Sequence, residues 1–305
     1  MRPTGSANAA GLSTDTQRSL SISDYVALTK PRLNLLVVAT SAAGYYLGAT
    51  RPVLPLEMAE AVIGTALVAS GAAVLNQVYE RDTDRLMRRT RTRPLPDGRV
   101  SPPDAYRFGL VLSGAGLLLL AVSTNVVATL LALTTIVVYL TVYTPMKRRS
   151  SLSTLVGAIP GALPPLIGWA AASGTLSMGG WALFGIVFLW QIPHFMAIAW
   201  MYRDDYKNAG FPMLPVVEPD GRRAGQQALL YSIALIPMSL LPAYIGVSGW
   251  FYFWVALAFG FALLGLAARF AMKRSDRAAR WLFFGSITYL PLLWASMIID
   301  HSAFK

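Results

Sequence analysis

The stretch NQVYERDTDRLMRRTRTRPLPDGRVSPP, residues Asn76–Pro103, marks the point where an apolar segment becomes the most densely charged part of the chain. The segment before it, Ala61–Leu75, contains only apolar and small residues and is long enough for several helical turns. The sequence therefore predicts a transmembrane helix that leaves the bilayer near Asn76. The rest of the chain can be placed around this exit.

Three oxygen-bearing side chains follow one another at helical spacing along this exit. Asn76, Glu80 and Asp84 stand at i, i+4 and i+8, which puts them on one face of a continuing helix. A carboxylate costs about 2.5 to 3.5 kcal/mol at the centre of a membrane helix and less near the interface, so it usually has a cation or a polar cavity beside it. Mg²⁺ fits such a face best, because it binds one or two carboxylates and completes its shell with water and phosphate oxygens.

The loop after the acidic face is rich in arginine. Arg88, Arg89, Arg91 and Arg93 carry planar guanidinium groups that match phosphate oxygens in pairs. Together with the acidic face, they indicate a metal-diphosphate site. The alternative is that these arginines only anchor a cytoplasmic loop, as positive loops commonly do, and that the acidic residues pair with them.

The composition is that of a membrane protein. Of the 305 residues, 55% are hydrophobic and 13% are charged, which is too apolar for a water-soluble globule of this length. The net charge of +11 does not indicate nucleic-acid binding, because the basic residues lie in short gaps between apolar segments and not on an aromatic platform. The absence of cysteine excludes disulfides, and two histidines alone cannot form a zinc site.

We therefore expect an all-α polytopic membrane protein with about nine transmembrane helices bundled around a central cavity. Residues 1–20 lack an apolar core and are expected to be disordered, whereas residues 21–305 form a single transmembrane domain. The predicted spans lie at about 33–49, 56–79, 106–124, 126–144, 153–172, 179–200, 226–246, 249–269 and 281–299.

The distribution of basic residues predicts the orientation of these spans. If the amino terminus is cytoplasmic, all Lys and Arg residues except Arg51 and Lys305 fall on the cytoplasmic side. The carboxyl terminus is then outside. The charged segments after the second and sixth spans both become cytoplasmic caps.

A second charged exit closes the sixth span. The sequence LWQIPHFMAIAWMYRDDYKNAGFPMLP, residues Leu189–Pro215, places Asp204 and Asp205 where the helix should reach the interface. His194 lies eleven residues before Asp205, or about three turns, so the two are expected to share a helix face if Pro193 does not rotate the helix too far.

The segment Tyr143–Trp169 is rich in glycine and proline. It starts with a short cytoplasmic loop that contains Lys147 and Arg148, and continues with Gly157, Gly161 and Gly168 around Pro160, Pro164 and Pro165. Proline-broken helices at membrane depth occur where they are buried in protein or line a cavity. This favours a helix at the cavity wall. A kinked helix without substrate contact is the alternative.

The two exits resemble those of the UbiA-type intramembrane prenyltransferases, and the details resemble the protohaem IX farnesyltransferase branch. Asn76, Glu80 and Asp84 fill the first family motif, with Glu in place of the more usual Asp. The branch-specific matches are Met87, Arg89, Thr90, Arg93, Pro94, Leu95, Ser101 and Pro102, then Tyr143-Thr144 with Lys147-Arg148, Gly161–Pro165, Gly168-Trp169, Pro193–Phe195, Asp205-Tyr206 and Gly210.

This resemblance implies transfer of a farnesyl group from farnesyl diphosphate to a vinyl group of haem b. Haem b is then a substrate and Mg²⁺ the cofactor, with a cell inner membrane location and a haem A synthase as a candidate partner. The second motif departs from the family, because Ala209 stands four residues after Asp205 where a second acid is expected. Ser153 likewise stands where the branch leads us to expect Asn.

The resemblance also implies roles for individual residues. Mg²⁺ is expected between Asn76, Glu80 and Asp84 on one side and Asp205 on the other. Arg89, Arg93, Lys147 and Arg148 are expected to bind the diphosphate. By their position alone, Tyr139, Tyr143 and Tyr202 are candidates for an aromatic wall around the prenyl group. His194 is expected in the substrate site as an iron ligand, a propionate partner or a base, or else as a donor to a carbonyl freed by Pro193. His301 is expected at the surface.

Three other functions compete with this one. A prenyltransferase that acts on a quinone precursor or another aromatic acceptor would share the whole site. An ion-coupled transporter would place its acidic residues near the bilayer midplane, whereas these cluster at one side. A CDP-alcohol phosphotransferase would need a longer Asp-Gly-containing motif that the chain lacks.

Overall fold

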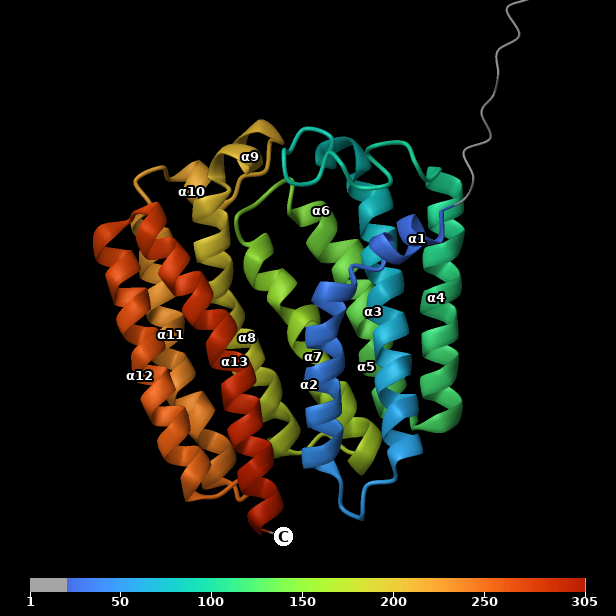
Figure 1. Ribbon diagram of the computed structural model, residues 1–305, viewed down its shortest axis with the longest axis vertical. Helices are drawn as coiled ribbons and strands as arrows, with labels where there is room; N and C mark the ends of the chain where they lie inside the picture. Colours follow the sequence, from blue (N-terminus) through green and yellow to red (C-terminus); the bar gives the residue numbers. More distant parts are fainter. Residues whose placement is uncertain (1–20, 305) are drawn as a thin grey trace, which may run out of the picture.

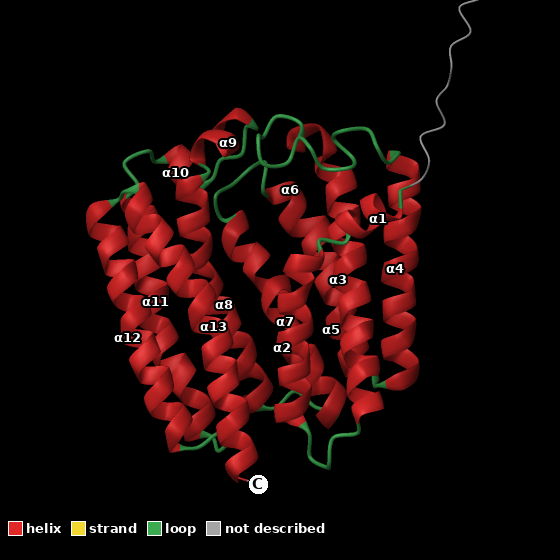
Figure 2. Cartoon of the chain, in the orientation of Figure 1, coloured by secondary structure: helices red, strands yellow, loops and turns green. Residues whose placement is uncertain are grey.

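The computed structural model describes residues 21–304, and every regular element within them is a helix (Figures 1 and 2). This confirms the predicted all-α class; the disorder expected for residues 1–20 lies outside the described residues. The elements are α1 Ile22–Leu28, α2 Pro31–Gly48, α3 Pro55–Asp84, α4 Pro102–Ser123, α5 Val126–Val137, the π-helix η1 Val138–Tyr143, α6 Thr144–Met146, α7 Ser153–Ser173, α8 Met178–Met201, α9 Arg203–Asn208, α10 Leu214–Val217, α11 Arg222–Tyr244, α12 Trp250–Lys273 and α13 Asp276–Phe304.

The long helices run side by side in one bundle, and the short helices α1, α9 and α10 lie at one end of it (Figure 1). Eight helical segments in the described part of the chain are long and apolar enough to cross a membrane, with α5, η1 and α6 counted as one. The chain is therefore a multi-pass membrane protein. Helix α2 lies in the same bundle, but Arg32 and Asn34 in its first turns lower its hydropathy, so the expected total of nine spans stays a prediction.

Helix α7 is the central helix of the bundle. In its most apolar window 61% of the residues are buried, against 28% in α4, and all three of its prolines are among the buried residues. It packs against α2, α5 and α8. This confirms that the glycine- and proline-rich helix faces protein and not lipid.

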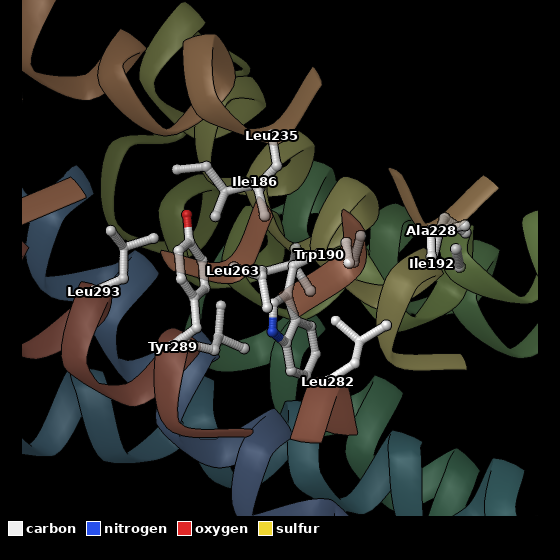
Figure 3. Close-up of a cluster of buried hydrophobic side chains, with 14 of the residues drawn as sticks. Ile186, Trp190, Ile192, Ala228, Leu235, Leu263, Leu282, Tyr289 and Leu293 are labelled. Carbon is white, nitrogen blue, oxygen red and sulfur yellow. The ribbon is translucent and has the colours of Figure 1, made fainter. Parts of the chain in front are cut away.

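Two apolar clusters meet at α7. The larger one joins α7 and α8 to α11, α12 and α13, and Figure 3 shows Trp190, Leu263, Leu282 and Tyr289 in it. The smaller one joins α7 to α3, α4 and α5. The core is thus divided between the two halves of the bundle, with the proline-rich helix common to both.

His301 is buried, so its expected surface position was wrong. Its side chain is 7% exposed, its Nδ1 lies 2.6 Å from the carbonyl oxygen of Val247, and its ring meets the ring of Tyr46 edge-on. The reason is that α13 is longer than the predicted 281–299 span. Its last turns therefore pack against α2 and the α11–α12 connection.

Candidate functional site

The three oxygen-bearing residues of the first exit lie on one buried face of α3, as predicted. Asn76, Glu80 and Asp84 are 3%, 5% and 1% exposed, whereas Tyr79 and Asp82 between them are exposed. Helix α3 continues to Asp84. The helix therefore delivers two carboxylates and one amide to a protein-enclosed space and not to bulk water.

The π-helix η1 positions the partner of Asn76. In its wide turn the Thr144 hydroxyl donates to the carbonyl of Tyr139 at 2.7 Å and accepts a hydrogen bond from Asn76 Nδ2 at 3.0 Å. The Tyr139 hydroxyl lies 3.5 Å from Asn76 Oδ1. Single π-turns inside α-helices are frequent at functional sites. Here the turn fixes the Asn76 amide and leaves its oxygen with one long contact.

Lys147 neutralises Glu80. Its Nζ lies 3.0 Å from Glu80 Oε1 and 3.1 Å from Oε2, and 4.7 Å from the centre of the Phe211 ring. Burial lowers the pKa of the Lys147 ammonium, but the Tyr143 hydroxyl and the Glu80 carboxylate outweigh it, so its pKa is raised. The lysine therefore stays charged inside the protein.

Asp84 pairs with Arg93, which the α3–α4 loop brings back over the end of α3. Arg93 Nη1 lies 2.8 Å from Asp84 Oδ2, and the Thr90 hydroxyl donates to the Asp84 carbonyl at 2.8 Å. Arg88 and Arg91 are exposed. The expected alternative, in which acidic residues pair with loop arginines, thus holds for Asp84 and Arg93.

The second exit meets the first one. Arg89 lies over the Tyr202 ring, 5.2 Å from its centre, and Met87 packs in a buried cluster with Ala199 and Phe211. In Figure 1 the α3–α4 loop and α9 lie beside each other at the same end of the bundle. The two charged segments, more than a hundred residues apart in sequence, therefore form one surface of the molecule.

His194 and Asp205 do not share a helix, so this prediction was wrong. Helix α8 ends at Met201, the backbone leaves helical geometry at Tyr202, and α9 begins at Arg203. Asp205 is half-buried, and its carboxylate makes no ion pair or hydrogen bond in the described part of the chain. The break turns the acidic segment across the end of the bundle.

The donor set on α3 is suited to Mg²⁺. Two carboxylates and an amide oxygen are hard ligands, and the only partner that the described residues give the buried Glu80 carboxylate is the Lys147 ammonium. Within residues 21–304, no three His, Asp or Glu side chains lie close enough to hold a metal ion on their own. Asp205 is therefore not grouped with Glu80 and Asp84, and a bound metal would need further ligands from water or substrate.

The other predicted residues lie in three places. Tyr143 stacks on Tyr139 with ring centres 5.2 Å apart, beside the acidic face. Arg148 is exposed and has no ion-pair partner among the described residues. His194 lies away from the acidic residues, between α8 and α13, where its Nδ1 is 2.8 Å from Ser286 Oγ. It does not donate to a carbonyl freed by Pro193.

Lys30 was not predicted as a site residue. It lies between α1 and α2 and adopts a left-handed backbone conformation with φ 52°. Its ammonium interacts electrostatically with the charged groups of Arg93, Glu80, Lys147 and Asp84. Burial first, and then the Arg93 charge, lower the pKa of Lys30 to about 8. The sequence feature that could have identified Lys30 as a site residue is its position directly before the first span, on the same predicted side of the membrane as the acidic exit.

Comparison with known proteins gives consistent matches. The sequence profile described as the UbiA prenyltransferase family matches residues 37–289. A protoheme IX farnesyltransferase of Solibacter usitatus is 46% identical over 287 residues, which cover 91% of this chain and 98% of that protein. A solved structure of digeranylgeranylglyceryl phosphate synthase has a TM-score of 0.78 at 16% identity and covers 92% of this chain and 98% of its own. A UbiA homologue from Archaeoglobus fulgidus, bound to GPP and Mg²⁺, has a TM-score of 0.65 at 17% identity and covers 90% of this chain and 99% of its own.

Proposed function

The chain belongs to the UbiA prenyltransferase family, and we propose that it transfers a farnesyl group from farnesyl diphosphate to a vinyl group of haem b. Diphosphate leaves, and water completes the hydroxyethylfarnesyl substituent of haem O. The observation that carries this proposal is the 46% identity to a protoheme IX farnesyltransferase over nearly the whole of both chains. The buried acidic face and its surrounding cations support it independently.

The diphosphate site is proposed at the meeting point of the two exits. Lys147 and Arg93 already lie within ion-pair distance of the acidic face, and Arg89 and Arg148 lie nearby on the loops. Negative charge grows on the diphosphate as the allylic C–O bond breaks. Preorganised cations aimed at that charge lower the barrier by several kcal/mol, because they need no reorganisation during the reaction.

The metal site is proposed at Asn76, Glu80 and Asp84, with Asp205 joining through the substrate. The Archaeoglobus homologue binds Mg²⁺ together with GPP, which supports divalent metal use in this fold. When bound, Mg²⁺ would supply positive charge to the leaving diphosphate oxygens. Asn76, Asp84 and the Glu80 carboxylate, which Lys147 already contacts, would hold it.

The prenyl group is proposed to lie against Tyr143 and Tyr139 on one side and Tyr202 on the other. The first two rings are stacked beside the acidic face, and Tyr202 lies under Arg89. Aromatic faces can stabilise a developing allylic cation by about 0.5 to 2 kcal/mol. They also exclude water, which would otherwise capture the cation.

We place the protein in the cell inner membrane with its amino terminus cytoplasmic and its carboxyl terminus outside. Arg51, one of the two basic residues expected outside, belongs to the α2–α3 connection, which lies at the end of the bundle opposite α1, α9 and α10 (Figure 1). The lipid bilayer would deliver both apolar substrates. A haem A synthase is the proposed partner that takes up haem O.

The experiment that tests this function is incubation of the purified full chain with haem b, farnesyl diphosphate and Mg²⁺. We expect a farnesylated haem by mass spectrometry, and its loss when the metal is chelated. A prenylated quinone precursor in place of farnesylated haem would assign a sister branch of the family. Ion flux into proteoliposomes without any prenylated product would favour the transporter.

Lys30 gives a pH-dependent prediction. Because its pKa is lowered to about 8, its amine is charged below that pH and neutral above it. The value of kcat/KM for farnesyl diphosphate should therefore fall as the pH rises through about 8. Lys30→Arg, whose guanidinium stays protonated, should remove this fall. An identical alkaline limb in both proteins would rule out Lys30 as the titrating group.

A further inference from the structure

His194 stacks on two aromatic rings from two helices. Its imidazole stacks on Trp190, one turn earlier in α8, with ring centres 5.1 Å apart and planes 17° apart. It also stacks on Phe283 of α13, with ring centres 5.1 Å apart and planes 21° apart. The Trp190 indole also donates to the Ser286 carbonyl at 2.7 Å, which ties this turn of α13 to α8. The ring cannot turn without disturbing both helices.

A hydrogen bond also fixes the tautomer of His194. The Ser286 hydroxyl donates its single hydrogen to the Phe283 carbonyl at 2.7 Å. It must therefore accept in its 2.8 Å contact with His194 Nδ1, so Nδ1 carries the proton. In the neutral ring Nε2 is then an unprotonated nitrogen with a free lone pair.

Nε2 has no hydrogen-bond partner in the described part of the chain, although His194 is half-buried. Nε2 is not one of the fully enclosed side-chain atoms that lack a partner, so a ligand can reach its lone pair. A metal-binding histidine typically donates its other ring nitrogen to a protein oxygen, which orients the ring and sets the tautomer. His194 has this arrangement without a metal-binding neighbour of its own.

We infer that His194 Nε2 ligates the iron of the acceptor haem and that Ser286 is the positioning residue that keeps this nitrogen unprotonated. The inference rests on the proposed function, because haem b is the substrate that supplies the iron. A propionate partner would need a donor at Nε2, which this tautomer does not have.

The position of His194 along α8 suits this role. It lies seven residues before Met201, or about 10 Å along the helix axis from the end that carries Tyr202. Iron at this depth would lie deeper in the bundle than the proposed diphosphate site. A vinyl group on the rim of the haem could then point toward the prenyl group held above it.

The test is a spectroscopic titration of the purified full chain with ferric haem b in the absence of farnesyl diphosphate. The wild-type protein should give the absorption and electron paramagnetic resonance signatures of imidazole ligation. His194→Gln and His194→Ala should lose them. Ser286→Ala should keep the signature but bind haem about 10- to 100-fold more weakly, which is the usual cost of losing such an orienting partner.

His301→Gln is the matched control, because the chain contains only two histidines and the second one is buried far along α13. It should keep the wild-type spectrum. The assignment is overturned if monodisperse His194→Gln protein keeps the imidazole-ligation spectrum, even when its turnover is lower. It is also overturned if His301→Gln loses that spectrum to the same extent as His194→Gln. The titration needs no turnover, so a protein that shows imidazole ligation but makes no farnesylated haem would refute the proposed reaction and not the ligation.

Discussion

Replacing Asp84 by Asn is expected to reduce farnesyl transfer by at least about 100-fold while the helix bundle stays folded. Removal of one preorganised group that stabilises a developing charge typically costs about 10² to 10³ in kcat. Asp84 is 1% exposed and carries the charge that Arg93 balances, so the proposed metal site has no substitute for it. Asn keeps the size and shape of the side chain. Arg93 stays partly solvated, so the fold should tolerate its unpaired charge.

The matched control is Asp82→Asn on the same helix. Asp82 is exposed, and within residues 21–304 it pairs only with its neighbour Arg81; a surface pair of this kind contributes about 0 to 1 kcal/mol. The farnesyl transfer rate of the Asp82→Asn protein should stay within about two-fold of wild type, because the lost surface ion pair contributes so little. Rates would be measured by mass spectrometry of farnesylated haem on proteins matched by size-exclusion profile. Near-wild-type activity in Asp84→Asn would refute the proposed role of the acidic face.

Gly168→Ala is expected to destabilise the bundle strongly. A Cβ at Gly168 would lie 2.0 Å from the Ser41 carbonyl oxygen and 2.8 Å from the Tyr45 nitrogen, both backbone atoms of α2. Backbone cannot move aside as a flexible side chain can, so α2 and α7 would have to separate. Extra atoms in a close-packed core cost about 1 to 3 kcal/mol, occasionally more, and this contact is among the tightest in the protein.

The control for this variant is Gly114→Ala in α4, where an added Cβ meets nothing within 4 Å. It should be neutral or slightly stabilising, because alanine favours helix by about 1 kcal/mol over glycine. Thermal unfolding of both detergent-solubilised proteins would be followed by loss of the monodisperse peak. Equal midpoints for the two variants would contradict the backbone contact between α2 and α7.

Helical spacing was enough to predict the acidic face. Asn76, Glu80 and Asp84 repeat every fourth residue after an apolar run, and such a local pattern survives in any fold that keeps α3 helical. The buried position of α7 followed likewise from its glycines and prolines. These features depend on neighbours in sequence and on the membrane as solvent.

Features that depend on tertiary contacts could not be predicted in this way. Lys30 reaches the site only because the turn between α1 and α2, two helices that both pack against α3, brings it there, and its left-handed backbone has no glycine to indicate it. The pairing of Glu80 with Lys147 joins residues that are 67 positions apart. His301 looked like a terminal surface residue, since nothing local to it indicates the extra turns of α13.

The π-helix between α5 and α6 has a consequence for how the site tolerates change. Each residue of an α-helix advances the chain by about 100° around its axis, so one surplus residue in a wide turn rotates everything that follows. Thr144 and Lys147 come directly after that turn, and both contact α3. The direction in which Lys147 points from its helix toward Glu80 is therefore set by the π-helical turn. A change in the length of this segment would misalign the cation even with every side chain of the site retained.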